Sequence, residues 1–162
     1  RLPIVMGIGN RALSAPINIW CDHQDTMAER DAGWLQFYAE SNQEAVDFQI
    51  QAFRVSETVF LPSFTCIDGY ILSHNHEIVD IPTQEQVDQF LPPYHPKYRL
   101  DPEEPWIFGT MAEPAYYQET RMALDQALQK ALPVIERIGQ EFEQLFGRPG
   151  LRAVEALSLI HI

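Results

Sequence analysis

The feature that most constrains the fold is a strand–helix–strand succession in the first half of the chain. Trp34 to Ala39 is aromatic and extended in character, and the letters S-N-Q-E that follow place Ser41 and Glu44 in a capping box. We expect a helix from this box to about Glu57, then a β-rich run, Val59 to Ile67, and a D-G turn. This succession favours a parallel sheet with helices on its faces, and therefore an α/β fold.

Two further β-rich runs precede this unit. Leu2 to Ile8 is expected to form a buried strand that leads into Asn10 and Arg11. The second run, Ile17 to Cys21, ends in four consecutive polar residues: Asp22, His23, Gln24 and Asp25. Ligands of open α/β sheets bind outside the carboxyl ends of the strands, so we expect a site where these two strand ends meet.

The second half of the chain is read as a short helix followed by a strap. Thr83 and Gln86 form another capping box, which predicts a helix that ends near Phe90. Residues 92–105 are rich in proline and have no periodicity, so they are expected to form a surface strap.

A long helix is predicted from Tyr117 to Phe146, because apolar residues recur there at steps of three and four. Its apolar stripe consists of Leu124, Leu128, Ala131, Ile135, Ile138, Phe142 and Leu145. Pro133 should kink this helix, and Gly147 with Pro149 should end it.

Charge and composition exclude several classes of partner. The formal net charge of −12 opposes binding to nucleic acid, whose affinity for proteins is mostly built from Lys and Arg contacts. The chain shows neither an apolar run of about 20 residues that could span a membrane nor a signal peptide, so a cytoplasmic protein is expected. Cys21 and Cys66 form no C-x-x-C pair and are most simply read as small buried residues.

Several motifs together resemble the α subunit of the 2-oxoacid:ferredoxin oxidoreductases, of which pyruvate:ferredoxin oxidoreductase is the best-known member. They are spread over nearly the whole chain and are specific in combination. They comprise G-N-R-A-L-S-A-P at Gly9 to Pro16, D-H-Q-D at Asp22 to Asp25, Arg30 to Gly33, Q-E-A at Gln43 to Ala45, D-G-Y-I-L-S-H at Asp68 to His74 and F-L-P-P-Y at Phe90 to Tyr94.

The resemblance implies a partial thiamine-diphosphate-binding fold plus a long C-terminal helix. Residues 1–116 would be the C-terminal half of the pyrimidine-type domain, residues 117–147 the helix, and residues 148–156 a linker to a following domain. Both ends of the chain look cut. Residues 157–162 break the preceding pattern and are expected to be a non-native, adapter-derived tail.

In this family the catalytic glutamate that activates the cofactor lies in the half-domain expected to precede this chain. The resemblance therefore implies no catalytic residue here and an inactive fragment. Thiamine diphosphate with Mg²⁺, the iron–sulfur clusters and coenzyme A would be held largely by other domains or subunits, and electrons would pass to ferredoxin or flavodoxin.

The resemblance aligns Arg11 with the family arginine that contacts the substrate. A guanidinium is always charged and can donate two parallel hydrogen bonds to an anionic 2-oxo acid. Asn10 is a weaker candidate, and Asp22 to Asp25 would lie near the site without an assigned step. Residue type alone would make Arg11 a salt-bridging arginine at a strand end.

Other chemistry-bearing residues have plainer explanations. The D-H-Q-D run superficially resembles a metal site, but such groups more often bond to nearby backbone, and no metal is expected. His74 and His76, with Glu77 beside them, lack a nominated third metal ligand and are expected to be structural. Asp68-Gly69 is read first as a turn and second as part of the wall of the site.

The predicted function is oxidative decarboxylation of pyruvate to acetyl-CoA and CO2, as in anaerobic metabolism. Two alternatives stay open. A paralogue could act on a branched-chain 2-oxo acid or 2-oxoglutarate, and a non-catalytic interaction domain could bind through the proline strap and the acidic surface.

Overall fold

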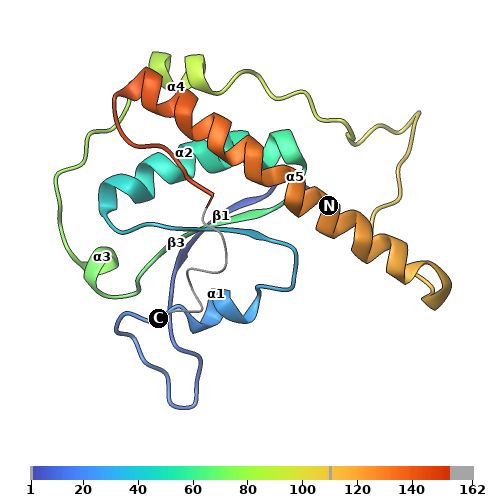
Figure 1. The fold of residues 1–162 in the computed structure, drawn as a ribbon, viewed down its shortest axis with the longest axis horizontal. Helices are drawn as coiled ribbons and strands as arrows, with labels where there is room; N and C mark the ends of the chain where they lie inside the picture. Colours follow the sequence, from blue (N-terminus) through green and yellow to red (C-terminus); the bar gives the residue numbers. More distant parts are fainter. Residues whose placement is uncertain (1, 110, 154–162) are drawn as a thin grey trace.

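The computed structural model describes residues 2–109 and 111–153 and has an α/β architecture around a parallel sheet (Figure 1). The three strands of the sheet, β1 (Val5–Gly9), β2 (Leu35–Tyr38) and β3 (Ser63–Ile67), lie in the order β1-β3-β2. In this register Val5 and Leu35 both lie opposite Ser63. The predicted parallel sheet is confirmed, and its strands all end at one edge.

Helix α2 (Asn42–Val59) connects β2 to β3, as the sequence predicts. The Ser41 hydroxyl accepts a hydrogen bond from the Glu44 amide at 3.2 Å. In a capping box the Glu44 carboxylate would accept a hydrogen bond from the Ser41 amide. Here it accepts from the amide of the preceding residue, Glu40, so only the Ser41 half of the predicted capping box forms. The helix ends at Val59, where Phe60 adopts the left-handed conformation, and β3 therefore begins later than the β-rich run suggests.

The core lies on one face of the sheet, where α2 packs and α5 (Pro114–Phe146) crosses it (Figure 1). Helix α4 (Gln84–Phe90) packs against α5. The predicted Thr83–Gln86 capping box at its start is confirmed. The core cluster of buried apolar residues comprises Leu35, Phe37, Ala52, Val55, Leu61, Phe90, Ala131, Ile135, Ile138, Phe142 and Leu151. Alternate residues of each strand therefore face α2, and the intervening residues face the opposite side.

Helix α5 confirms the predicted apolar stripe, of which Ala131, Ile135, Ile138 and Phe142 are buried. It begins at Pro114 rather than Tyr117, because proline fits the first turn of a helix, where the missing amide has no partner to lose. The helix runs through Pro133 without a break and ends at Gly147, whose φ of 67° is left-handed.

The segment after α5 packs on the body of the protein. The side chain of Leu151 is buried, and its amide donates to the Gln51 side chain at 2.8 Å. The Arg148 guanidinium donates two hydrogen bonds to Asp47 of α2 at 2.9 Å. The domain boundaries and the linker role of residues 148–156 stay predictions, and the tail at 157–162 lies outside the described residues.

The strap between α4 and α5 has no helix or strand among its described residues, as predicted (Figure 1). Tyr98 anchors it, because its ring packs edge-on against Phe60 at the end of α2, and against Trp106 and Phe108 within the strap. None of the described helices is long and apolar enough to cross a membrane.

Candidate functional site

The site is built at the carboxyl end of β1, where Asn10 and Arg11 follow the strand. The Asn10 amide continues the sheet by donating to the Ile67 carbonyl at 2.9 Å. The prediction of a buried strand over Leu2 to Ile8 is wrong in part: β1 is one edge of the sheet, and Ile4 and Met6 are each 44% exposed. Among the described residues only β3 pairs with it.

The second expected strand, Ile17 to Cys21, does not form. These residues lie in a loop whose one bridge joins Ala12 to Asn18, and the side chains of Ile17 and Trp20 are more than half exposed. Strand propensity reflects packing on a pleated surface, and the described part of the chain supplies no neighbouring strand there. The loop nevertheless brings Asp25 back to the end of β1. Asp25 therefore meets Asn10 and Arg11 as predicted, although it follows a loop and not a second strand.

The Asp25 carboxylate connects this loop to Asn10 and Arg11 at the end of β1. One carboxylate oxygen accepts from the Asn10 side-chain amide and from the Thr26 amide, both at 2.7 Å, and the other accepts from the Arg11 amide at 3.0 Å. The Asp25 amide in turn donates to the Arg11 carbonyl at 3.3 Å.

The polar network continues from Asn10 to β2 on the face of the sheet opposite α2. The Asn10 side-chain amide also donates to the Thr26 hydroxyl at 2.7 Å, and that hydroxyl lies 2.9 Å from the Tyr38 hydroxyl. Tyr38 donates to the Gln36 side chain, which donates back to the Thr26 carbonyl. Burial raises the pKa of Tyr38, although its hydrogen bond to Thr26 opposes the shift.

Arg11 lies over the tip of the sheet, on the α2 side. Its Nη1 donates to the Asn10 carbonyl at 2.9 Å. A methyl group added at Gly9 would lie 4.0 Å from this nitrogen, and one added at Gly69, directly after β3, would overlap it. The guanidinium therefore occupies space that exists because residue 69 is a glycine.

The Arg11 side chain forms no ion pair with a carboxylate among the described residues, whereas six other arginines do. Asp25 binds the backbone of Arg11 and leaves the guanidinium to other partners. The plain explanation of Arg11 as a salt-bridging residue is therefore wrong for this part of the chain. A half-buried, oriented guanidinium at the strand ends is suited to bind an anion.

The other members of the D-H-Q-D run shape the loop. Asp22 accepts from the Gln24 amide at 2.7 Å, and the Gln24 side chain accepts from the Leu13 amide at 2.8 Å. The His23 ring packs edge-on against Tyr38 with 4.9 Å between centroids. Asp22 and Gln24 therefore hold the loop through backbone contacts, and His23 packs on β2.

Asp68 caps the short helix α3 (Ile71–His74) next to Gly69. Its carboxylate accepts from the amides of Tyr70, Ile71 and Leu72. Partial burial raises the pKa of this carboxyl, but these three amide donors outweigh burial and lower it below its usual range. The turn reading of Asp68-Gly69 is confirmed, and the turn also borders Arg11.

The two cysteines differ in environment. Cys66 of β3 is fully buried, as expected, and burial raises the pKa of its thiol to about 12. The expectation for Cys21 is wrong, because this residue lies exposed in the loop, with its sulfur 3.7 Å from an Asp68 oxygen.

A mostly apolar groove of about 510 Å³ runs between the sheet and α2, and one of its lining residues, Gly9, lies near the Arg11 guanidinium. It is lined by Gly7, Ile8, Gly9, Ala45, Val46, Gln49, Ile50, Thr65 and Ile67. The hydroxyl of Thr65 is buried and has no hydrogen-bond partner among the described residues.

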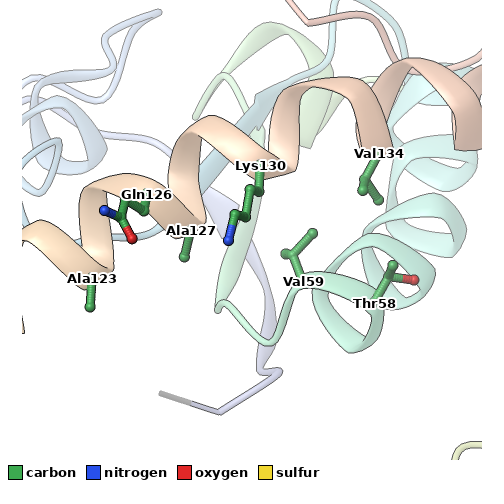
Figure 2. A pocket seen from close by; sticks show the side chains of 7 residues that line it. All are labelled: Thr58, Val59, Ala123, Gln126, Ala127, Lys130 and Val134. Atoms are coloured by element: carbon green, nitrogen blue, oxygen red, sulfur yellow. The ribbon is translucent and has the colours of Figure 1, made fainter.

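A second hollow, of about 430 Å³, lies between the end of α2 and the middle of α5 (Figure 2). Figure 2 shows the Lys130 side chain extending from α5 into this hollow, which Val59 at the end of α2 also lines. Because α2 ends where β3 is about to begin, this hollow lies at the amino edge of the sheet, away from Arg11.

His74 ends α3 and His76 follows it in a loop, with both side chains exposed. The Ser73 hydroxyl lies 2.9 Å from the His74 ring nitrogen. The described residues contain no group of three His, Cys, Asp or Glu side chains placed to hold a metal ion.

Sequence reasoning missed three residues of this site: Thr26, Gln36 and Tyr38. Gln36 and Tyr38 carried a signal, because polar residues at alternate positions of a strand share one face. Gly69 was expected second as part of the wall of the site, and it lies against the Arg11 guanidinium.

The fold and the site define an α/β protein with a parallel sheet and, at its carboxyl edge, an arginine that pairs with no carboxylate among the described residues. A family model described as pyruvate flavodoxin/ferredoxin oxidoreductase, thiamine diphosphate-binding, matches residues 1–140. The chain belongs to this family.

Curated relatives include pyruvate synthase subunits PorA. That of Methanothermobacter thermautotrophicus is 53% identical over 91% of this chain and 39% of its own length, and that of Pyrococcus abyssi is 54% identical over 91% and 38%. The ketoisovalerate oxidoreductase subunit VorA of Pyrococcus abyssi is 47% identical over 96% and 40%. This chain spans about two fifths of the length of these relatives.

Proposed function

We propose that this chain is part of the α subunit of a pyruvate:ferredoxin oxidoreductase, which converts pyruvate and coenzyme A to acetyl-CoA and CO2 and passes the electrons to ferredoxin or flavodoxin. Family membership and the PorA relatives support the proposal, since six such subunits are 50–54% identical to the chain and two VorA subunits 45–47%. The proposal includes a cytoplasmic location and assembly with other subunits.

The observation that carries the proposal is the Arg11 guanidinium, which is oriented at the carboxyl edge and has no carboxylate partner among the described residues. We propose that it donates to the carboxylate and the 2-oxo group of the substrate. The carbonyl oxygen becomes more negative as its carbon is attacked, so a fixed cation there stabilises the transition state more than the bound substrate.

Thiamine diphosphate, when bound, supplies the nucleophilic carbon and accepts the electrons left when CO2 departs. The described residues at the edge fit one part of this chemistry, since they provide an anion-binding arginine and an apolar groove beside it. We propose that Mg²⁺ and the diphosphate are held by other parts of the complex, as are the iron–sulfur clusters and coenzyme A. The residues of this chain would then bind and orient the 2-oxo acid.

Arg11→Ala in the complete, assembled enzyme tests this function. We expect kcat/KM for pyruvate to fall about 100-fold or more, because a charge-assisted, transition-state contact is lost. Subunit assembly and cofactor content should be unchanged. Turnover equal to that of the wild-type enzyme would contradict the assigned role. The alternative, a non-catalytic interaction domain, predicts this result.

The substrate class can be separated in the same assay. The VorA relatives make a branched-chain 2-oxo acid the second candidate. Comparison of kcat/KM for pyruvate, 2-oxoisovalerate and 2-oxoglutarate decides among them, and pyruvate is expected to be preferred.

A further inference from the structure

We infer that Asp25 is a positioning residue for the substrate arginine: its carboxylate fixes the backbone of Arg11 and thereby aims the guanidinium. This inference rests on the proposed role of Arg11 and adds a function for a residue that had no assigned step. It is argued from hydrogen bonds at the end of β1.

Asp25 holds the Arg11 backbone from both sides. Its carboxylate accepts from the Arg11 amide at 3.0 Å, and its own amide donates to the Arg11 carbonyl at 3.3 Å. Few rotations remain for a residue whose N–H and C=O are bound by the same neighbour. The direction in which the Arg11 side chain leaves the strand end is therefore set by Asp25.

Asp25 also fixes the residue before Arg11. The Asn10 side chain is fully buried, and its amide nitrogen donates to Asp25 and Thr26 at 2.7 Å each. The guanidinium of Arg11 in turn donates to the Asn10 carbonyl at 2.9 Å. Anchoring the Asn10 side chain therefore also fixes the carbonyl to which the guanidinium is bonded.

The geometry requires a carboxylate at position 25 rather than an amide. Three N–H donors converge on it, two on one oxygen and one on the other. An asparagine has a single acceptor oxygen, so in either orientation its NH2 group would face at least one of these donors. The Asp25→Asn variant keeps the shape of the side chain but loses at least one of the three hydrogen bonds that this carboxylate accepts.

Helix capping is the plainer role for Asp25, since it lies in the first turn of α1 (Gln24–Ala28). Capping alone predicts a loss of stability without a specific effect on the 2-oxo acid. The two roles are therefore distinguished by kinetics and not by thermal stability.

The test is a double-mutant cycle in the complete enzyme with Asp25→Asn, Arg11→Ala and the double variant. We expect Asp25→Asn to lower kcat/KM for pyruvate about 10- to 100-fold, with kcat reduced as well as KM raised, because a misplaced guanidinium also stabilises the transition state less. In the Arg11→Ala background the same change should have almost no further effect. The matched control is Asp31→Asn, an exposed aspartate in the same connector, which should leave KM unchanged.

Each outcome is decisive. If Arg11→Ala lowers kcat/KM but Asp25→Asn matches the Asp31→Asn control, or adds its full effect to Arg11→Ala, the positioning role is wrong while the proposed function stands. If Arg11→Ala has no effect, the proposed function fails. Should Asp25→Asn not assemble, Asp25→Glu replaces it in the cycle, since it keeps both oxygens but shifts them by one methylene; an unchanged kcat/KM then overturns the inference.

Discussion

At the scale of single residues, the site depends on which guanidinium nitrogens of Arg11 have no hydrogen-bond partner among the described residues. Arg11 uses one guanidinium nitrogen on the Asn10 carbonyl and pairs with no carboxylate among the described residues. In a chain with 23 acidic and 11 basic residues, an unpaired arginine is informative, because neighbouring carboxylates are easily found. The Asp25 carboxylate accepts from two backbone amides and from the Asn10 side chain, which is why the guanidinium stays available for an anion.

Gly69→Ala tests whether the space beside β3 holds the guanidinium. The added methyl would overlap Arg11 Nη1 and the Asn10 carbonyl, so we expect the guanidinium to shift and KM for the 2-oxo acid to rise about 10-fold or more. The control is Gly109→Ala, where the added methyl meets no described atom within 4 Å; since the φ of Gly109 is 72°, this variant carries backbone strain of its own but no overlap. Equal KM values in the two variants would contradict the placement of Arg11.

At the scale of elements, close backbone contacts decide how the helices pack. Gly139 lies inside α5, where glycine is normally less stable than alanine by about 1 kcal/mol. In this protein the Leu151 carbonyl and Gly150 approach Gly139 so closely that a methyl group there would overlap the Leu151 carbonyl. The glycine therefore serves the docking of residues 148–153 on the helix.

Gly139→Ala should consequently destabilise the protein, contrary to helix propensity. We expect a loss of about 1–3 kcal/mol in the free energy of unfolding, because the segment must move away from α5. Denaturant unfolding and limited proteolysis of the full-length protein would measure the loss and the release of residues 148–153. Gln140→Ala, on the exposed side of the same turn, should be neutral, and a stabilised Gly139→Ala variant would contradict the packing.

At the scale of the whole molecule, Arg148 joins three segments that are far apart in the chain. It donates to Asp47 of α2, whose side chain is 3% exposed, and to Asp80 in the loop before α4. The Gln43 side chain binds the backbone of Asp80 at the same place. The Asp47 hydrogen bonds raise the pKa of Arg148, so this arginine stays charged in the folded protein.

Arg148→Gln should cost about 3–5 kcal/mol of unfolding free energy, because it leaves the Asp47 carboxylate buried without a cation. The matched change Arg152→Gln breaks an exposed pair with Glu143 and should cost at most about 1 kcal/mol. Denaturant titration of both variants of the full-length protein measures the difference. Equal costs would show that the Asp47 contact is as weakly stabilising as a surface pair.

The sequence by itself determined the parallel α/β unit, the two capped helices α2 and α4, and the apolar stripe of α5. These depend on local signals: hydrophobic periodicity, Ser41 and Thr83 at helix starts, and Gly147 at a helix end. The family motifs also singled out Arg11 and Asp25. Neither periodicity nor motifs predicted how these two residues are connected.

Only the tertiary structure decided that Ile17 to Cys21 is a loop, that Cys21 is exposed, and that Asp25 reaches the end of β1. The reason is physical. A strand needs a neighbouring strand to pair with, and whether an arginine forms an ion pair depends on which carboxylates the fold brings near it. Both conditions depend on residues distant in the chain. Local sequence can nominate an arginine, but the contacts of Asn10, Asp25 and Gly69 determine where its charge points.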